Sequence, residues 1–356
     1  MPAAAVPTPM HAPGLPLAVL GAGAWGSALA VHACARNPVL LWARDPQLVR
    51  QLRQRGENSR YLPEIALPDS LRVEDSLPEA LRHAAAGMLV LAVPVAALRS
   101  VALALRRLWQ DPQAPRPVPL LILAKGFEQG SALLPHEVVE EVFADADERP
   151  PIGLLSGPSF ALEVARGLPA ALVAAGSSAV RDAAVRALHG GALRIYASED
   201  LVGVGVGGAV KNVLAIACGI SDGLRQGANA RAALITRGLA EMARLGQALG
   251  ARHETFMGLS GVGDLVLTCT GDLSRNRRVG LQLAAGKDLP GVMRQLGHVA
   301  EGVHAARTVR ELARRHQLRM PITEQVCELL DGRVDAQAAL RALLAREPRA
   351  EAEGEA

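Results

Sequence analysis

The sequence predicts an α/β fold in which a Rossmann-like, doubly wound sheet is followed by an all-helical C-terminal domain. A glycine-rich turn, Gly21–Gly26, stands between a short apolar run and a helical pattern. Short apolar runs then alternate with helical segments as far as about Ser198. From Leu201 onward the strand pattern stops and helical patterns take over. The predicted boundaries are 1–16 for a disordered N-terminal tail, 17–198 for the sheet domain, 199–345 for the helical domain and 346–356 for an acidic disordered tail.

Length and composition limit the class of protein. A chain of 356 residues exceeds one typical domain, and two domains are the natural expectation. The net charge of +3 is small and the basic residues are interspersed with acids, so no nucleic-acid-binding face is expected. The four cysteines are far apart and form no CxxC pair. This spacing argues against a metal site or a disulfide framework and favours a reducing compartment.

The N-terminal segment does not direct the chain into a membrane. Residues 1–16 contain several prolines and no basic n-region, so they are not a signal peptide. Leu15–Ala35 carries no formal charge over a length that could span a bilayer. However, the glycines of a tight turn lie near its centre, and a strand, turn and helix explain it better. We therefore expect a soluble, cytoplasmic protein with no membrane insertion.

The glycine-rich turn predicts a dinucleotide-binding site. Leu17–Leu20 is the expected first strand, and the GAGAWG sequence after it is a complete GxGxxG match before a helix. Gly21 allows the tight turn, Gly23 lets the backbone reach a pyrophosphate, and Gly26 allows close packing of helix on strand. The N-terminus of that helix supplies free N–H groups for the phosphates.

The end of the second expected strand, Val39–Trp42, bears on the choice of cofactor. In folds of this type an acidic residue near this point holds the ribose hydroxyls of NAD, whereas an arginine accommodates the 2′-phosphate of NADP. Arg44 comes first and favours NADPH, but Asp45 leaves NADH open. The alternative is an ordinary polar strand end.

Two later strand ends carry candidate site residues. Lys125 follows a strand directly, at the edge of the sheet where ligands bind, although a loop lysine is usually only solvated. Ser156–Ser159 follows the next strand, and Pro158 is suited to the first turn of a helix ending near Arg166. The alternative there is a plain helix cap. Further strands are predicted at Met88–Val93, Leu120–Ala124, Ile152–Leu155, Ala170–Ala174 and Leu193–Tyr196, with helices such as Leu77–Arg82 and Leu133–Phe143 between them.

The first helical segment of the second domain, Val202–Asp222, is almost entirely small and apolar but carries Lys211 in its middle. Desolvation of an ammonium lowers its pKa, so Lys211 is either a paired structural charge or a proton-transfer group. Only three of the 38 basic residues are lysines, and arginine cannot give up its proton. Gly207 and Gly208 lie one turn earlier on the same face, where a ligand could approach the backbone. Lys211 is therefore the leading catalytic candidate.

A second candidate site lies in Met257–Arg278, which its glycines predict to be a flexible loop. Ser274 is a good N-cap for the helix that follows, and Arg275 stands in its first turn. Arginine opposes the helix dipole at this place, but it becomes favourable if an anion is bound there. The alternative is a plain capped surface helix. Asp264, in the same segment, could orient a lysine or a substrate hydroxyl. The other predicted helices are Asn229–Leu249, Asn276–Ala285, Val303–His316, Ile322–Leu330 and Ala336–Leu344.

Taken together, these motifs resemble the bacterial-type NAD(P)-dependent glycerol-3-phosphate dehydrogenases. The resemblance runs from Val19 to about Leu344. The segments that carry it are GAGAWGSALA, LAVP at Leu91–Pro94, AKG at Ala124–Gly126, SGPSFA at Ser156–Ala161, GGAVKN at Gly207–Asn212, ALITRGLAEMARLG at Ala233–Gly246, and GLSGVGDLVLTCT followed by SRN at Ser274–Asn276.

The resemblance implies the reduction of dihydroxyacetone phosphate to sn-glycerol 3-phosphate, the precursor of glycerophospholipids. NADPH or NADH is the implied cofactor, with NADPH favoured, and Lys211 is the implied proton-transfer residue. Where the family often has Ser or Thr after GxG this chain has Ala24, so a hydroxyl contact to the cofactor phosphates is missing. The implied substrate residues are Lys125, Gly157, Ser159, Lys211, Asp264, Ser274, Arg275 and Asn276. The implied cofactor residues are Gly21, Gly23, Ala24, Trp25, Gly26, Arg44, Lys125, Ala161, Arg275, Val299 and Glu301.

The residues themselves suggest the same mechanism. Lys211 would give its proton to the developing alkoxide while a hydride reaches the ketone carbon, and Lys125 would lower the pKa of Lys211. Arg275 and the helix start at Ser274 would hold the phosphate. One rival is a β-hydroxyacid or 6-phosphogluconate-type dehydrogenase, but those enzymes space Lys and Asn further apart than Lys211 and Asn212. The other rival is a redox-sensing regulator, which needs no phosphate site. The sequence leaves the oligomeric state open, with a homodimer as one alternative.

Overall fold

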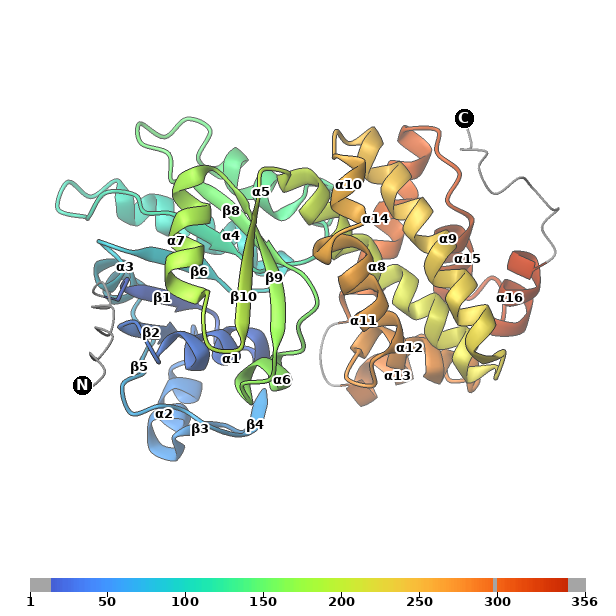
Figure 1. Ribbon diagram of the computed structural model, residues 1–356, viewed down its shortest axis with the longest axis horizontal. Coiled ribbons are helices and arrows are strands. Elements are labelled where there is room, and N and C mark those ends of the chain that lie inside the picture. Colours follow the sequence, from blue (N-terminus) through green and yellow to red (C-terminus); the bar gives the residue numbers. More distant parts are fainter. Residues whose placement is uncertain (1–13, 297–299, 345–356) are drawn as a thin grey trace, which may run out of the picture.

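The computed structural model describes residues 14–296 and 300–344. The predicted disordered tails, 1–16 and 346–356, therefore lie outside the described residues, apart from positions 14–16. Figure 1 shows a part built around a sheet on the left and a helical part on the right. The long helix α8 (Leu201–Gly223) lies at their junction.

One large sheet organises the first part of the chain. Eight strands follow the order β10-β9-β8-β7-β6-β1-β2-β5, and neighbouring strands are parallel except for the pair β8 and β9. Strand order reverses between β1 and β6, and ligands bind at the carboxyl ends of strands at such a point. Strands β3 and β4 form a separate antiparallel hairpin. The strands are β1 (Leu17–Leu20), β2 (Val39–Trp42), β3 (Glu57–Asn58), β4 (Leu62–Ala66), β5 (Arg72–Glu74), β6 (Met88–Leu91), β7 (Leu120–Ile122), β8 (Ile152–Ser156), β9 (Ala170–Gly176) and β10 (Leu193–Ser198).

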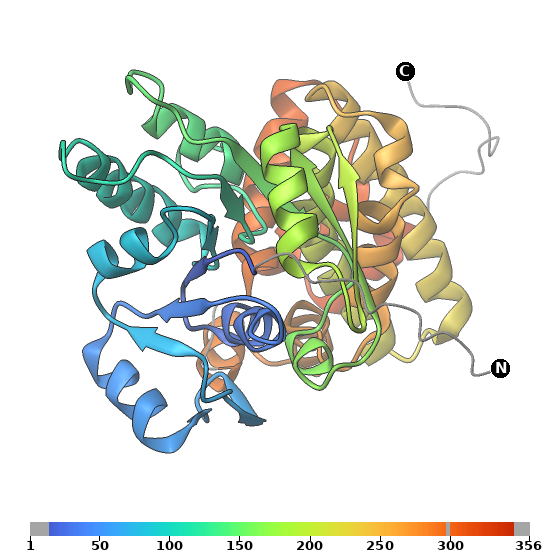
Figure 2. The ribbon, with the colours of Figure 1, turned by 60° about the vertical axis from the view of Figure 1, so that its left-hand side comes forward.

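Helices cover both faces of this sheet, which confirms the predicted doubly wound architecture. Leu17 and Val19 of β1 belong to a buried cluster that also contains residues of α1, α2 and α7, whereas Ala18 and Leu20 belong to one that contains residues of α3, α4 and α5. Figure 2 brings this part forward, with the blue β2 and β5 and the green β9 and β10 at opposite ends of the sheet. The helices are α1 (Ala24–Ala33), α2 (Pro46–Arg55), α3 (Leu77–His83), α4 (Val95–Trp109), α5 (Pro135–Val142), α6 (Ala161–Ala165) and α7 (Ser178–Leu188).

The segment Ser156–Ser159 differs from its prediction. We expected Pro158 in the first turn of a helix, but α6 begins only at Ala161, with Phe160 as its N-cap. Gly157 has φ +132°, a conformation that no helix contains, so the chain turns before the helix starts. The turn leaves the backbone of Gly157 at the carboxyl end of β8.

All described elements after Ser198 are helical, in agreement with the predicted fold class. The central helix α8 is long and apolar enough to cross a membrane, but 89% of that stretch is buried inside the protein. It packs against β8 on one side and against α9, α11, α12 and α14 on the others. It is therefore the core helix of this part. The remaining helices are α9 (Gly227–Ala248), α10 (His253–Phe256), α11 (Asp264–Thr270), α12 (Arg275–Ala284), α13 (Leu289–Leu296), α14 (Glu301–Arg315), α15 (Pro321–Leu330) and α16 (Ala336–Leu344).

The prediction of a flexible loop at Met257–Arg278 is wrong. A π-helical turn, Leu259–Gly263, leads straight into α11, and Gly261 serves close packing. A Cβ atom on Gly261 would lie 2.1 Å from the carbonyl oxygen of Phe256, and one on Gly207 would lie 2.3 Å from that of Ser260. The glycine-rich composition was misleading because it reflects contact between helices and not freedom of the backbone.

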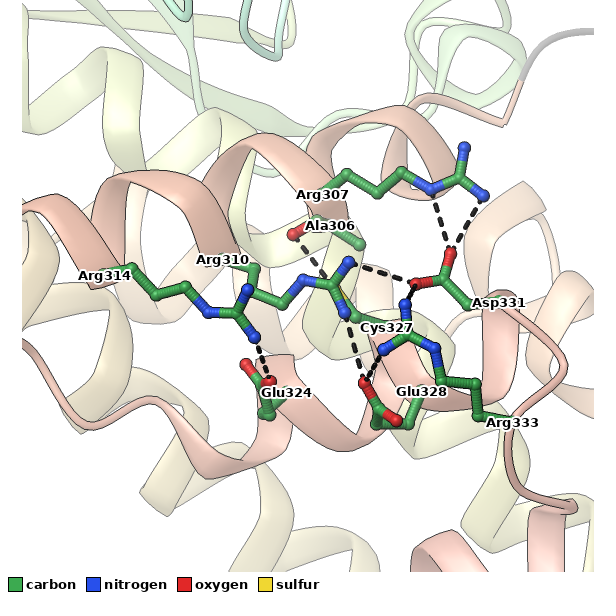
Figure 3. A network of polar contacts seen from close by, with 9 residues as sticks. All are labelled: Ala306, Arg307, Arg310, Arg314, Glu324, Cys327, Glu328, Asp331 and Arg333. Carbon is green, nitrogen blue, oxygen red and sulfur yellow. Dashed lines mark hydrogen bonds and ion pairs between the residues drawn. The ribbon is translucent and has the colours of Figure 1, made fainter.

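A set of ion pairs joins α14 to α15 and the turn after it, as Figure 3 shows. Arg310 donates to Asp331 at 3.0 Å and to Glu328 at 3.3 Å, while Arg314 pairs with Glu324 at 2.7 Å. Planar guanidinium groups suit such multiple contacts with carboxylates. We call this set the α14–α15 arginine network. Its members are Arg307, Arg310, Arg314, Glu324, Glu328, Asp331 and Arg333.

Candidate active site

Three charged side chains meet where the two parts of the chain join. Lys211 of α8 donates a hydrogen bond to Oδ1 of Asp264, the first residue of α11. Lys125, which follows β7, donates to Oδ2 of Asp264 at 2.8 Å and to the carbonyl oxygen of Gly157 at 3.2 Å. We call Lys125, Asp264 and Lys211 the Lys–Asp–Lys cluster. The structure therefore brings together four of the residues predicted to surround the substrate.

Burial controls the protonation of this cluster. The side chain of Lys211 is only 9% exposed and that of Asp264 only 1%. Burial lowers the pKa of Lys211 to about 7; Asp264 opposes this shift, whereas Lys125 adds to it. Burial alone would raise the pKa of Asp264, but the two ammonium groups hold it below its usual range. Lys211 can therefore exchange a proton near neutral pH, as general acid–base catalysis requires.

The two glycines before Lys211 have a different use from the one predicted. We expected open backbone there for a ligand, but Gly207 packs against the backbone of Ser260. A Cβ atom on Gly208 would lie 3.3 Å from Cγ of Lys125 and 3.2 Å from Oγ of Ser156. The glycines thus let protein approach α8 closely. This close approach is what buries Lys211.

A chain of side-chain amides lies beside the cluster and links three helices. Asn276 of α12 donates to Oδ1 of Asn212 at 2.8 Å, and its own Oδ1 accepts from the N–H of Gly302 at 3.0 Å. Asn212 in turn donates to the carbonyl oxygen of Gly208 at 3.2 Å. The sequence indicated Asn276 as a substrate residue, and the structure gives its amide these two protein partners. The part played by Asn212 was missed, although its position next to Lys211 was visible.

The start of α12 has the features of an anion site. Ser274 is buried and caps the helix, with its Oγ accepting from the N–H of Arg277 at 3.2 Å. Arg275 is exposed and forms no hydrogen bond or ion pair with the residues that the structure describes. Arg277, by contrast, is engaged with Asp222 and Asp272. Arg275 is thus available for a phosphate at this helix start.

The glycine-rich turn fits the pyrophosphate of a dinucleotide. Gly21 has φ +126°, and a Cβ atom on Gly26 would lie 2.0 Å from its carbonyl oxygen. A Cβ atom on Gly23 would meet nothing within 4 Å, so the backbone there faces open space. No side chain caps the N-terminus of α1. The first N–H groups of α1, including those of Ala24 and Trp25, are therefore free of a side-chain partner and can bind phosphate oxygens.

The other predicted cofactor residues are spread around this turn. Arg44 is exposed, whereas Asp45 caps α2 by accepting from the N–H of Gln47 at 2.9 Å. Ala161 belongs to the apolar cluster that also contains Trp25. Glu301 lies close to Gly126, the residue after Lys125, since a Cβ atom on Gly126 would be 3.4 Å from Oε2 of Glu301. Burial raises the pKa of Glu301.

Some site residues are less constrained by the structure. Ser159 is half-buried, with its hydroxyl donating to the carbonyl oxygen of Gly157 at 3.3 Å. Val299 lies outside the described residues. Within residues 14–296 and 300–344, no group of three or more His, Cys, Asp or Glu side chains is arranged to hold a metal ion.

Comparison with known proteins agrees with this geometry. Residues 16–181 match the family model for the N-terminal part of NAD-dependent glycerol-3-phosphate dehydrogenase, and residues 200–341 match that for the C-terminal part. Glycerol-3-phosphate dehydrogenase [NAD(P)+] of Burkholderia orbicola is 56% identical, over 94% of this chain and 99% of its own length. The enzyme of the same name from Leptothrix cholodnii is 55% identical, again over 94% and 99% of the two chains.

A solved structure extends the similarity to three dimensions. The crystal structure of glycerol-3-phosphate dehydrogenase from Coxiella burnetii superimposes with a TM-score of 0.86 at 40% identity, covering 94% of this chain and 99% of that one. The predicted resemblance is therefore confirmed over nearly the whole length. The chain belongs to the NAD-dependent glycerol-3-phosphate dehydrogenase family.

Proposed function

We propose that Lys211 is the proton donor in the reduction of dihydroxyacetone phosphate to sn-glycerol 3-phosphate. The observation that carries this proposal is a buried lysine with a pKa of about 7 that is bound to Asp264. When bound, NADPH or NADH supplies the hydride that reduces the ketone. Protonated Lys211 then neutralises the alkoxide oxygen as negative charge develops there. In the reverse reaction neutral Lys211 accepts the proton of the alcohol.

Lys125 and Asp264 have supporting roles in this proposal. Asp264 holds both ammonium groups through its two oxygens, which sets their positions relative to each other. Lys125 keeps the pKa of Lys211 low and places a second positive charge beside the developing alkoxide. Its bond to the carbonyl of Gly157 ties it to the end of β8, so the substrate would lie between β8 and α8.

The phosphate of the substrate would bind at the start of α12. The N–H groups after the Ser274 cap and the guanidinium of Arg275 provide donors and positive charge there. Asn276, in the same turn, is connected through Asn212 to the backbone of α8. Binding of the phosphate would therefore place the carbonyl of the substrate close to Lys211.

Removal of Arg275 tests the phosphate site. Arg275→Ala deletes a charge-assisted contact of roughly 1.5–3 kcal/mol, which should raise the KM for dihydroxyacetone phosphate by about ten- to a hundredfold. The assay follows NADPH oxidation. Dihydroxyacetone, which lacks the phosphate, should be used about equally poorly by both proteins. An unchanged KM for dihydroxyacetone phosphate would rule out this site, and no activity of the parent with this substrate would rule out the reaction.

We also propose that NADPH is the preferred cofactor. Arg44 follows β2 and is exposed, while the carboxylate of Asp45 is engaged in capping α2. A 2′-phosphate would therefore meet a guanidinium, and the ribose hydroxyls of NADH would find Asp45 engaged. Arg44→Ala should raise the KM for NADPH far more than that for NADH. Equal changes in the two KM values would contradict the assignment.

Four further proposals concern the protein as a whole. Residues 17–198 would form the dinucleotide-binding domain and 199–345 the substrate and catalytic domain, since the last strand ends at Ser198 and α8 starts at Leu201.

The enzyme would be cytoplasmic and would supply glycerophospholipid synthesis. A homodimer is the proposed assembly, and sedimentation of the purified enzyme would test it.

A further inference from the structure

A buried asparagine in the β3–β4 hairpin reaches the glycine-rich turn from 36 positions along the chain. Asn58 donates from Nδ2 to the carbonyl oxygen of Ala22 at 2.9 Å and to Oγ of Ser27 at 2.8 Å. Ala22 lies between the first two glycines of the turn, and Ser27 lies in the first turns of α1. One side-chain amide therefore joins the turn to the helix whose N-terminus would face the pyrophosphate.

The two hydrogen bonds constrain the part of the turn whose N–H groups have to point toward the phosphates of the cofactor. A peptide group is planar, so fixing the direction of the carbonyl of Ala22 also fixes the N–H of Gly23 on the opposite side. A carbonyl oxygen that rotated toward the open side would bring negative partial charge to the phosphates. Asn58 has its own orientation set by the N–H of Tyr61, which donates to its Oδ1 at 3.3 Å.

The hairpin that carries Asn58 is itself packed against the cofactor side of the sheet. Leu62 and Ile65 are buried with Ala28 of α1, and half-buried Trp25 and Ala161 pack against the same cluster. Figure 1 shows α1, α6 and β4 together at one end of the sheet. Arg166 at the end of α6 pairs with Glu64 of β4 at 3.0 Å. The hairpin thus contacts two elements that bear predicted cofactor residues.

We propose that Asn58 is a positioning residue for dinucleotide binding. Its amide holds the peptide between Ala22 and Gly23 so that the turn is shaped for the pyrophosphate before the cofactor arrives. Such preorganisation increases affinity because less order has to be created on binding. Asn58 does not touch the reacting atoms, so its effect falls on cofactor affinity more than on the use of dihydroxyacetone phosphate.

The chain offers a matched control for a merely structural role. Asn37, beyond the C-terminal end of α1, is also buried and donates from Nδ2 to the carbonyl oxygens of Ala33 at 3.0 Å and Ala187 at 2.8 Å. Its Oδ1 accepts from the N–H of Leu15 at 2.9 Å. Asn37 thus has the same chemistry and burial as Asn58 but lies at the opposite end of the helix from the glycine-rich turn.

The experiment compares Asn58→Ala with Asn37→Ala. NADPH affinity is measured by fluorescence titration of the protein without substrate, and Tm by thermal unfolding. Both variants should lower Tm. Asn58→Ala should weaken NADPH binding by roughly tenfold, because the two hydrogen bonds that it loses hold the glycine-rich turn. The affinity of Asn37→Ala for NADPH should stay within about twofold of the parent, because its lost hydrogen bonds lie away from that turn. The KM for dihydroxyacetone phosphate should change less than the affinity for NADPH.

Equal loss of NADPH affinity in the two variants, or no loss in Asn58→Ala, would overturn the proposal. If Asn58→Ala does not fold, Ser27→Ala takes its place, because it removes one of the two acceptors and leaves a residue that helices tolerate well. A loss of NADPH affinity of a few-fold in Ser27→Ala supports the proposal, whether or not Tm falls with the loss of this buried hydrogen bond. An unchanged affinity in that variant counts against it.

Discussion

The Lys–Asp–Lys cluster and the α14–α15 arginine network are both groups of bases around carboxylates, yet they differ in the base used and in the burial of their most enclosed residues. Lys211 and Asp264 have side chains only 9% and 1% exposed. In the network Arg310 and Asp331 are each 13% exposed, and Arg314 is 65% exposed. The first group lies where two parts of the chain meet, and the second joins two helices of one part.

The choice of base distinguishes a site suited to proton transfer from a purely structural group of ion pairs. Arginine keeps its proton under all working conditions and holds carboxylates with a planar fork, so the network can only bind its helices together. Lysine loses its proton readily once it is desolvated, and the cluster lowers the pKa of Lys211 to about 7. In a chain rich in arginine, a buried lysine is therefore the candidate for proton transfer.

Of the exchanges between lysine and arginine, the one at Lys211 should have the largest effect on turnover. Lys211→Arg retains the positive charge but removes the transferable proton, so turnover should fall by at least roughly 10²-fold, the usual size of general acid–base catalysis. NADPH affinity should remain within a few-fold of the parent. Turnover at saturating substrate and a fluorescence titration of NADPH measure the two effects.

The reciprocal exchange is the control. Arg310→Lys in the network preserves charge where no proton transfer is required, so turnover should stay within about twofold of the parent because the residue only binds carboxylates. Turnover of Lys211→Arg within tenfold of the parent would transfer the role of proton donor to Lys125 or to water.

Removing a carboxylate should change the pH dependence of the reduction rate in the Lys–Asp–Lys cluster but not in the α14–α15 arginine network. In the proposed mechanism Lys211 has to be protonated for reduction, so the rate of reduction should fall as pH rises through about 7. Asp264 raises the pKa of Lys211, and Asp264→Asn should therefore move this midpoint to lower pH. The profile of kcat/KM against pH gives the midpoint for the free enzyme.

Asp331→Asn in the network provides the matched measurement. It removes a carboxylate that binds Arg310 and lies outside the Lys–Asp–Lys cluster, so the midpoint should not change. A shift to higher pH in Asp264→Asn, or the same shift in both variants, would show that Asp264 does not control the protonation of Lys211.

The smallest effect is expected at the exposed edge of the network. Arg314→Ala removes an ion pair whose partners are well solvated, so it should reduce the free energy of unfolding by less than about 1 kcal/mol. The difference should shrink further with added salt, which screens exposed charges. Urea unfolding at low and high salt measures both. A loss above roughly 2 kcal/mol would show that the network contributes more than surface pairs usually do.

The central strands of the sheet were predictable because their residues are buried on both faces. Leu17–Leu20 and Val39–Trp42 were assigned without error, since every side chain in these runs is apolar and enclosed. The hairpin β3–β4 was missed because Leu62–Ala66 is mostly exposed and has no continuous apolar pattern. Asn58 was missed with it. A single buried asparagine is not visible in a sequence until its partners are known.

Those parts of the candidate site that follow from the chemistry of a single residue type were predictable. Lys211 was identified because desolvation of an amine has a chemical consequence that arginine lacks. The joining of Lys125, Lys211 and Asp264 depends on packing between parts of the chain 139 positions apart, which no local pattern encodes. The glycines of Met257–Arg278 were misread for the same reason. The closeness of Gly261 to the backbone of Phe256 appears only in three dimensions.

The glycines of α8 also bear on the order in which the protein folds. Six of its 23 residues are glycine, and each weakens an isolated helix by roughly 0.5–1 kcal/mol relative to alanine. Alanine cannot replace Gly219, for example, because its Cβ atom would lie 2.1 Å from the carbonyl oxygen of Arg277. During synthesis α8 leaves the ribosome before α9, α11 and α12, which supply its packing. We expect the helix that carries Lys211 to become stable only after those helices dock, so that the enzyme acquires activity at the end of folding.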